Sequence, residues 1–358
     1  MHVPDGYLSP ASCAALTAGV IPAWVVSARR LRQRLGTRRV PELALGAAFS
    51  FVVMMFNVPA PGGTTGHAVG AGLVAILVGP EAAIVSTTVA LAIQALLFGD
   101  GGILSLGANC FNLAFLMPVT SYALYRALTP EAASHRRRAL GAAVAAYVGL
   151  NVAALATAVE LGLQPLVAHD AAGAPLYCPF GLGVSVPAML LPHLLVFGWV
   201  EAVATGSVVA WASRSGTLAE VRPAQEVSPR PLWAGLGVLC LSTPLGLLAA
   251  GEAWGEWDTA GVRERAGAVP GGMERFGGLW SGLLPDYALP GWESGPWLAA
   301  AYVASALLGA GLVIFLAWGT VRLLTALQSE PAMGVPALQG SGGSASRSGE
   351  AEQPGRDP

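Results

Sequence analysis

Residues 139–161, ALGAAVAAYVGLNVAALATAVEL, form an apolar run in which Glu160 is the only charged residue. A helix needs about 20 mostly apolar residues to cross the hydrocarbon core of a bilayer, and this run is long enough. Three arginines, Arg136, Arg137 and Arg138, stand immediately before it. The stretch therefore predicts a membrane-spanning helix with a positively charged end.

The rest of the chain has the same character. It is 54% hydrophobic and only 11% charged, whereas soluble domains carry about 25% charged residues. Gly79-Pro80-Glu81 is a helix-breaking signal, which favours two short helices there over one long helix. In all, nine stretches predict membrane helices: 9–28, 42–58, 67–79, 81–98, 103–128, 139–161, 182–213, 231–250 and 296–326. The fold class expected is an all-α polytopic membrane protein, with a seven-helix substrate-binding bundle followed by a two-helix carboxy-terminal hairpin.

The basic residues indicate the orientation in the membrane. All 19 are arginine, and six of them lie in RRLRQRLGTRR, residues 29–39, after the first predicted helix. Alternating the helices puts 16 arginines on one side and leaves Arg263, Arg265 and Arg275 on the other. Because positive charge gathers in cytoplasmic loops, we expect a multi-pass protein of the cell (inner) membrane. Its amino terminus should lie outside and its carboxy terminus in the cytoplasm.

Changes in composition divide the chain into four parts. Residues 1–213 form the predicted membrane bundle, and residues 214–230, rich in Pro, Arg and Glu, form a cytoplasmic linker. Residues 231–326 form a two-helix accessory domain that encloses an external loop, 251–295. Residues 327–358, rich in Gly, Ser and charge, cannot bury enough apolar surface to fold and predict a disordered cytoplasmic tail.

The amino terminus carries a potential metal chelate. The chain begins MHVPDGYLSP, and Pro4-Asp5-Gly6 is a turn signal. The Met1 amine, the deprotonated backbone nitrogen of His2 and a nitrogen of its imidazole can close two fused chelate rings, one five-membered and one six-membered. Three nitrogens then lie in one plane around a metal ion. One more donor would complete a square, the geometry that favours Ni(II) or Cu(II) among first-row metals.

A second histidine lies on the same predicted side of the membrane. His67 is found in FNVPAPGGTTGHAVGAG, residues 56–72, where it is expected to open the next helix. Non-helical backbone at membrane depth occurs only where it is buried in protein or lines a cavity. We therefore expect this Gly- and Pro-rich segment to dip inward and bring His67 toward the amino terminus.

Other polar residues are weaker candidates. Beside an external metal cavity, Gln94, Asn109 and Asn112 could supply second-shell hydrogen bonds that orient the histidines. His193 and Glu201 lie on a similar face of one predicted helix and suggest a polar seam inside the bundle. The two remaining histidines, His135 and His169, are expected to lie in loops exposed to solvent.

Four ordered motifs resemble one known family. MHVPDGYLSP (1–10), FNVPAPGGTTGHAVG (56–70), QALLFGDGGI (94–103) and LGANCFN (106–112) are similar to the substrate-specific membrane component of energy-coupling-factor cobalt and nickel transporters, the CbiM/NikM family. The resemblance covers roughly residues 1–215. It implies that the metal is held by the Met1 amine, the His2 backbone nitrogen and imidazole, and the His67 imidazole.

The carboxy-terminal hairpin has its own resemblance. STPLGLLAAGEAWGEW (242–257) and GLLPDYALPGW (282–292) look like the smaller accessory membrane component (CbiN/NikN-like) or the related PDG-type domain, fused here in one chain. The typical run is Pro-Asp-Gly, where this sequence has Pro285-Asp286-Tyr287. The external loop carries scattered carboxylates, which are poor ligands for a borderline metal, so we expect it to cover, open or load the main cavity.

These features predict a protein that captures Co(II) or Ni(II) outside and delivers it for ATP-driven import. The chain has no G-x-x-x-x-G-K-[ST] phosphate loop, so it should not itself be an enzyme. The resemblance implies partners: two cytoplasmic ATPase subunits and a transmembrane coupling protein. The metal would be substrate, with no cofactor of the chain's own, and no nucleic-acid partner is expected. Small residues on the first predicted helix could contact the coupling protein, although internal packing is favoured: Ala11, Ala14, Ala15 and Ala18.

Two other functions compete with this interpretation. An intramembrane metalloenzyme would want HExxH or a similar ligand pair, and the sequence has none. The alternative that stays open is a proton-coupled secondary metal transporter. It would need paired intramembrane carboxylates, whereas Glu160, Glu201 and Asp100 are scattered along the chain.

Overall fold

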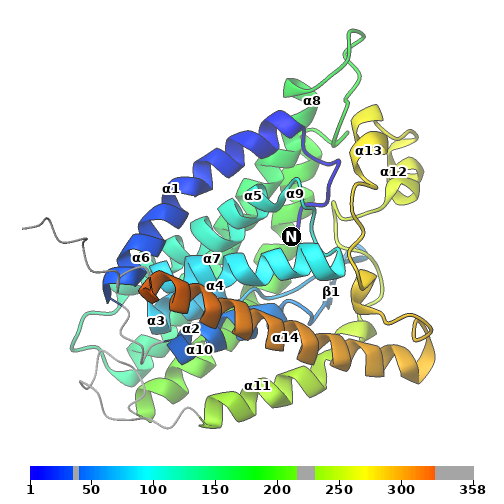
Figure 1. Ribbon diagram of the computed structural model, residues 1–358. Coiled ribbons are helices and arrows are strands. Elements are labelled where there is room, and N and C mark those ends of the chain that lie inside the picture. The colour runs from blue at the N-terminus through cyan, green and yellow to red at the C-terminus, as the bar shows by residue number, and fades with distance from the viewer. Residues whose placement is uncertain (35–39, 216–229, 327–358) are drawn as a thin grey trace, which may run out of the picture.

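The computed structural model describes residues 1–34, 40–215 and 230–326, and within them helices dominate (Figure 1). The larger helices are α1 (Pro10–Arg34), α2 (Val40–Val53), α3 (Ala71–Val78), α4 (Pro80–Ile93), α6 (Met117–Leu128), α7 (His135–Gly162), α9 (Leu182–Pro192), α10 (Gly198–Arg214), α11 (Arg230–Ser242) and α14 (Gly295–Ala326). The shorter ones are α5 (Leu106–Asn109), α8 (Gln164–Val167), α12 (Thr259–Ala266) and α13 (Gly271–Phe276). The strands β1 (Val58–Ala60) and β2 (Thr64–Gly66) form one antiparallel hairpin. The all-α polytopic class is confirmed.

The count of spanning helices differs from the prediction. Six helices in the described residues are long and apolar enough to cross a membrane: Pro10–Leu31, Pro80–Phe98, His135–Val167, Leu182–Arg214, Arg230–Leu248 and Gly295–Gly319. The third predicted span, 67–79, was wrong at its start, because residues 58–66 form the β-hairpin and α3 begins only at Ala71. His67 therefore does not open a helix. Most of the predicted linker and the predicted tail lie outside the described residues.

The segment Leu182–Arg214 has one exposed apolar face and one buried face. Leu191, Leu195, Trp199 and Val203 recur every four residues and are all more than half exposed, the lowest at 54%. A hydrocarbon environment suits such a stripe. The opposite face, four residues apart along the same helix, is buried and includes His193, Phe197, Glu201 and Thr205. His193, Glu201 and Thr205 thus point into the protein.

Three helices widen into π-helical turns near the amino terminus and its partners. These turns are Gln94–Phe98 after α4, Cys110–Leu116 between α5 and α6, and His193–Phe197 between α9 and α10. A π-turn shifts the register of the side chains that follow it, and such turns are frequent at functional sites. Here they supply Gln94, Asn112 and His193.

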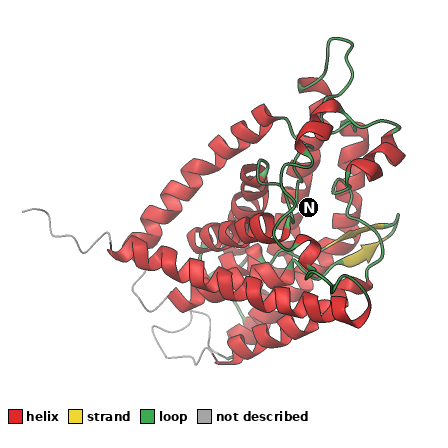
Figure 2. Cartoon of the chain, turned by 45° about the vertical axis from the view of Figure 1, so that its right-hand side comes forward, coloured by secondary structure: helices red, strands yellow, loops and turns green. Residues whose placement is uncertain are grey.

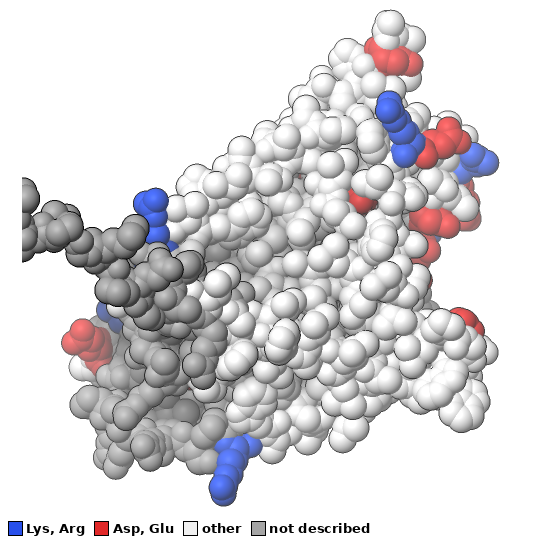
Figure 3. All heavy atoms as spheres, viewed as in Figure 1, with Lys and Arg blue, Asp and Glu red and all other residues white. Residues whose placement is uncertain are grey.

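The amino terminus contacts the loop between α11 and α14. The chain start lies among the helices rather than at their edge, as two views agree (Figures 1 and 2). Helices α11 and α14 pack against α2, and the loop between them carries α12 and α13. Figure 3 shows charged side chains at the two ends of the visible face, the acidic ones gathering over α12 and α13, with a broad uncharged band between. This distribution fits a membrane protein.

One packing expectation was wrong. The small residues of α1 were expected to pack internally, but the structure leaves all four exposed: Ala11, Ala14, Ala15 and Ala18. The buried side chains of α1 in this stretch are instead Cys13 and Val20. The alanine face of α1 is therefore open to lipid or to another protein.

Candidate metal centre

The first nine residues are held inside the protein, although chain termini usually fray. Met1, His2 and Val3 are only 4%, 3% and 1% exposed. The Val3 backbone N–H donates to Oδ1 of Asn109 (2.7 Å), and Nδ2 of Asn109 donates back to the Val3 carbonyl (3.1 Å). These two hydrogen bonds fix the position of the backbone directly after His2.

Asp5 anchors the same segment to the loop before α5. Its carboxylate accepts backbone N–H groups from Ile103, Leu104 and Ser105 at 3.0, 2.9 and 3.1 Å. The turn that presents it requires a glycine, since Gly6 has a φ of +86°. The Pro4-Asp5-Gly6 signal thus forms a turn whose side chain ties the amino terminus to residues 103–105.

The backbone around His67 is held by a buried carboxylate. Glu201 of α10 accepts the N–H of Val69 (2.7 Å) and that of Gly70 (3.1 Å). Gly70 adopts a left-handed φ of 74° at the start of α3. The β1–β2 hairpin and these bonds carry His67 inward, to 6% exposure.

The tautomer of His67 is set by its neighbour. Nδ1 lies 3.1 Å from the Ala68 carbonyl, which can only accept, so Nδ1 carries the proton. Nε2 then has a lone pair, and it is buried without a hydrogen-bond partner. Burial, followed by the charges of the amino terminus and His2, holds the pKa of His67 well below its usual 6.5. His67 therefore presents a neutral nitrogen, the form that binds metals.

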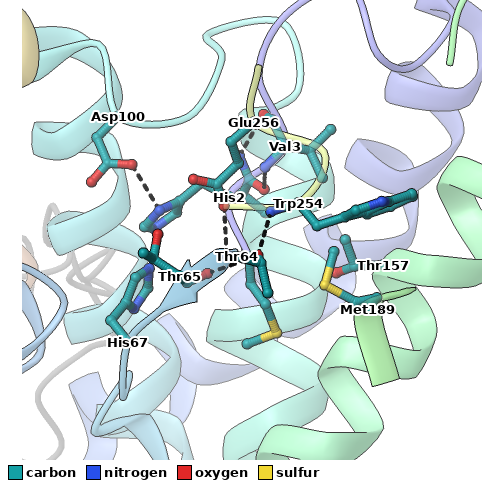
Figure 4. A network of polar contacts seen from close by, with 12 residues as sticks. His2, Val3, Thr64, Thr65, His67, Asp100, Thr157, Met189, Trp254 and Glu256 are labelled. Atoms are coloured by element: carbon teal, nitrogen blue, oxygen red, sulfur yellow. Dashed lines mark hydrogen bonds and ion pairs between the residues drawn. The ribbon is translucent and has the colours of Figure 1, made fainter. Parts of the chain in front are cut away.

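The structure brings His2 and His67 together. Their rings stack with centroids 5.0 Å apart and 27° between planes, and Figure 4 shows them side by side. Neither ring nitrogen of His2 makes a hydrogen bond within the protein. The expectation that residues 56–72 dip inward and carry His67 to the amino terminus is confirmed.

A carboxylate lies beside His2. Oδ1 of Asp100 is 2.8 Å from Nδ1 of His2, an ion-pair distance. Burial would raise the pKa of Asp100, but His2 and a hydrogen bond from Tyr287 outweigh it and hold this pKa well below its usual range. Asp100 therefore stays ionised next to the imidazole.

The Met1 amine has an acidic partner from the carboxy-terminal loop. Its nitrogen lies 2.6 Å from Oε1 of Glu256. The same loop is fastened to the hairpin, because the Trp254 N–H donates to Oγ1 of Thr64 at 3.0 Å. A small cavity opens beside Met1, and its lining includes Thr65, Met189, His193 and Trp254.

This arrangement can bind a metal ion through nitrogen. A six-membered chelate ring that includes the His2 amide nitrogen requires Nδ1 of the same imidazole. Rotating the His2 ring by half a turn about its Cβ–Cγ bond would turn Nδ1 away from Asp100. The edge of the ring that carries Nε2 would then face Asp100. With the Met1 amine, the His2 amide and Nε2 of His67, that makes four nitrogens. A coordinated amine keeps two N–H donors, so Glu256 can remain its acceptor. In the described residues no group of three His, Cys, Asp or Glu side chains gathers, as expected where backbone and terminal nitrogens dominate.

Comparison with known proteins places the chain in a family. Residues 2–217 match the family described as "Cobalt uptake substrate-specific transmembrane region", CbiM. The chain belongs to the CbiM family. Residues 230–326 match a second family, the PDGLE domain. The CbiM part thus contains His2, His67 and Asp100, while the PDGLE domain contributes Glu256 and Tyr287.

Curated relatives and solved structures agree with this assignment. The chain is 50% identical over 333 residues to the "Fused nickel transport protein NikMN" of Rhodobacter capsulatus, covering 88% of this chain and 95% of the relative. It is 44% identical over 324 residues to the "Probable fused nickel transport protein LarMN" of Lactiplantibacillus plantarum, with the same coverage. A crystal structure of a truncated transition metal transporter is 53% identical, covers 60% of this chain and 99% of its own, and superposes with a TM-score of 0.57.

The predicted second-shell residues of this CbiM-family chain have different partners. Asn109 holds the Val3 backbone, and Nε2 of Gln94 donates to the Tyr287 hydroxyl at 3.2 Å and lies 3.5 Å from Oδ2 of Asp100. Asn112 instead donates to Glu160 (2.8 Å) and Thr157 (3.1 Å). None of the three hydrogen-bonds an imidazole directly.

The remaining histidines also have definite places. His193 and Glu201 are both buried on one face of the helix, as predicted. His193 bonds the Met189 carbonyl (2.6 Å) and Glu201 bonds backbone N–H groups, so each has its own partner. His169 is exposed, as predicted. His135 is exposed too, as the first residue of α7.

Sequence reasoning missed three residues of the site: Asp100 as the partner of His2, Glu256 as the partner of Met1, and Tyr287. The GDGG turn at 99–102 was the available signal for Asp100, because it placed an acidic residue on the external side. Nothing local in the sequence indicated that Glu256 or Tyr287 would reach residues so far away in the chain.

Proposed function

We propose that the chain captures Co(II) or Ni(II) outside the cell and delivers it for ATP-driven import, as the substrate-binding component of an energy-coupling-factor transporter. The observation that carries this proposal is the stacking of His2 on His67 beside the buried amino-terminal residue Met1. Four nitrogens from Met1, His2 and His67 form the proposed metal site. The two named relatives are a nickel transport protein and a probable one, and the matched family is described by cobalt uptake, which supports these two substrates here.

The donor set fits these ions by its chemistry. Amine, amide and imidazole nitrogens suit Co(II), Ni(II) and Cu(II), and affinity rises along that series for almost any such site. Selectivity between cobalt and nickel therefore depends on geometry and on which ion is offered. The metal is the transported substrate in this proposal and needs no further cofactor.

The energy source in this proposal is a set of partner subunits. The sequence has no nucleotide-binding phosphate loop, and the exposed alanine face of α1 is a surface through which a coupling membrane protein could pack closely. Glu160 and Glu201 each bond to a different partner, Asn112 and the Val69–Gly70 backbone. Such separate structural roles support ATP-driven import over proton coupling.

Orientation is part of the proposal. The arginine distribution supports an external amino terminus, which would place Met1, His2 and the loop 251–295 where a scarce ion is captured. Labelling of single introduced cysteines with a membrane-impermeant reagent tests this: labelling in the 251–295 loop of intact cells is expected, and labelling only after lysis would reverse the assignment.

Metal uptake by whole cells separates the two energy sources. The chain would be expressed alone, with its coupling and ATPase partners, or with partners whose ATPase site is inactivated, and accumulation of radioactive nickel or cobalt measured. Sustained uptake is expected only with active partners and should survive a protonophore while ATP is maintained. Uptake by the chain alone that a protonophore abolishes would instead establish the proton-coupled alternative.

A further inference from the structure

Tyr287 adopts a backbone conformation that tyrosine rarely occupies. Its φ is +61°, and the preceding Asp286 has a φ of +53°, the only two non-glycine residues with positive φ in the described part of the chain. The left-handed region crowds a bulky side chain. Such a conformation persists only where the surroundings hold it, and it is a reason to look for a function.

The surroundings of Tyr287 fix its ring from several sides. The ring stacks on Phe98, with centroids 4.5 Å apart and 23° between planes, and meets Tyr302 edge-on at 5.4 Å. Oγ of Ser305 donates to the Tyr287 carbonyl at 2.8 Å. The residue is 6% exposed. Ring and backbone are therefore both held, and the hydroxyl has a fixed position.

That hydroxyl lies in the polar network of the metal centre. It donates to Oδ2 of Asp100 at 2.6 Å and accepts from Nε2 of Gln94 at 3.2 Å. The other oxygen of the Asp100 carboxylate, Oδ1, is the atom that lies 2.8 Å from His2. Tyr287 and His2 thus contact opposite oxygens of one carboxylate.

We propose that Tyr287 is a positioning residue of the metal site, which acts through Asp100 to fix the carboxylate against which the His2 imidazole lies. This inference rests on the proposed function. It makes the PDGLE domain a part of the metal centre, because the hydroxyl that holds Asp100 comes from that domain.

Tyr287 would act by keeping the Asp100 carboxylate from rotating. A metal-bound histidine is oriented by the acceptor that its second ring nitrogen meets, and loss of that acceptor lowers metal affinity by about 10- to 100-fold. Without the Tyr287 hydroxyl, Oδ2 of Asp100 keeps only the long 3.5 Å contact from Gln94. The carboxylate can then turn, and the His2 ring loses a fixed acceptor.

The chain offers a matched control. Tyr302 belongs to the same domain, is buried to 4% exposure and touches the Tyr287 ring. Its hydroxyl donates to the Met55 carbonyl at 3.3 Å. Tyr302→Phe therefore removes a buried hydroxyl from the same packing cluster while leaving the hydrogen bond on Asp100 in place.

The test uses the full-length protein in detergent, with Ni(II) binding followed by calorimetry and by the d–d absorption of the bound ion. Four variants are compared with the unaltered chain: Tyr287→Phe, Tyr302→Phe, Asp100→Asn and the double variant Tyr287→Phe/Asp100→Asn. Thermal unfolding of each shows whether the fold is retained. We expect Tyr287→Phe to weaken Ni(II) binding by about tenfold and to shift the absorption band, with one ion still bound.

The double variant decides whether the effect passes through Asp100. We expect it to bind no more weakly than Asp100→Asn alone, since the hydroxyl has nothing left to position, and Tyr302→Phe to match the unaltered chain. Unchanged affinity and spectrum in Tyr287→Phe, an equal loss in Tyr302→Phe, or additive losses in the double variant would each overturn the proposal. Should Tyr287→Phe fail to fold, Asp100→Asn with an unchanged spectrum would overturn it as well.

His67→Ala in the same assays separates this inference from the proposed function. If His67→Ala loses Ni(II) while Tyr287→Phe does not, the metal site stands and only the role of Tyr287 is wrong. If His67→Ala binds as tightly as the unaltered chain, the site itself is wrong, and the role of Tyr287 falls with it.

Discussion

The imidazole rings of His2 and His67 stack 5.0 Å apart, although one belongs to the chain terminus and the other to a hairpin loop. Nε2 of His67 and both ring nitrogens of His2 have no hydrogen-bond partner in the protein. Turning these nitrogens toward a shared ion therefore breaks no hydrogen bond, although Nδ1 of His2 gives up its 2.8 Å ion-pair contact with Asp100. Buried polar atoms without partners are costly, and a bound metal would satisfy them.

Replacing His67 by Ala should remove one of the four donors and leave the fold intact. We expect Ni(II) or Co(II) affinity to fall by more than the roughly 10- to 100-fold typical of a second-shell change, measured by calorimetry. His169→Ala is the control, because that histidine is exposed on the same predicted side. If His193→Ala abolished binding while His67→Ala did not, the fourth donor would be His193.

The protonation of His67 can be followed directly. Burial and the nearby positive charges hold its pKa well below 6.5, so its NMR signal in histidine-labelled protein should show no titration between pH 8 and about 6. The unfolded chain does bind a proton in this range, so this histidine makes stability fall as pH drops below about 6.5. A titration midpoint near 6.5 in the folded protein would contradict the assignment.

The pH dependence of metal binding follows from the other donors. The Met1 amine and the His2 amide must lose protons when the ion binds, so affinity should weaken as the external pH falls. Calorimetry in buffers of different ionisation enthalpy counts the protons released. An affinity that stays flat between mildly acidic and neutral pH would contradict ligation by these groups.

Asp5 should stabilise both the fold and the site. Asp5→Ala leaves the buried N–H group of Ser105 and the part-buried N–H groups of Ile103 and Leu104 without their acceptor, and a fully buried unpaired group costs about 1–3 kcal/mol. We expect a lower unfolding temperature together with weaker metal binding. Asp170→Ala is a matched control, because Asp170 also accepts two backbone N–H groups but is exposed, and water can replace it. Equal losses of stability in the two variants would show that burial is not the cause.

Removing the carboxy-terminal domain should change the metal affinity and the rate of metal entry but not the number of ions bound. All four proposed donors come from residues 1–67, so a chain without residues 231–326 should still bind one ion. It would lose Glu256 beside Met1 and Tyr287 beside Asp100, and we expect weaker binding and slower metal entry in stopped-flow measurements. A truncated protein that stays folded but binds no metal at equilibrium would make the loop a direct part of the site.

Much of the membrane architecture could be predicted because it depends on local composition. Apolar runs set the positions of the long helices, and the Pro4-Asp5-Gly6 and residue 56–72 patterns indicated a structured terminus and an inward loop. The start of α3 was misplaced, because Thr64–Gly66 pairs with Val58–Ala60 and the bonds of Val69 and Gly70 to Glu201 hold the backbone after His67 out of the helix. A three-residue strand carries too little pattern to compete with an apolar run.

The contacts that complete the site could not be predicted in the same way. The partners of Met1, His2 and Asp100 are Glu256, Asp100 and Tyr287, which come together only through the packing of α14 and its loop on the bundle. A single sequence shows which residues could ionise or donate, but not which of many loop carboxylates reaches the amine. The resemblance of the two parts to known families indicated their association without giving these pairs.

The free amine of Met1 is the central claim, and blocking it is the most direct test. The protein would be made with two residues before Met1 that a protease removes to restore the native terminus. Adding a single residue would be a less clear test, because it would move His2 to position 3 of the extended chain. A histidine at position 3 can itself form a square nitrogen chelate. Thermal unfolding would verify that the extended protein is folded. We predict that the extended protein binds no Ni(II) or Co(II) tightly and that cleavage restores one equivalent. Tight binding of one equivalent before cleavage, with the affinity unchanged afterwards, would contradict the account.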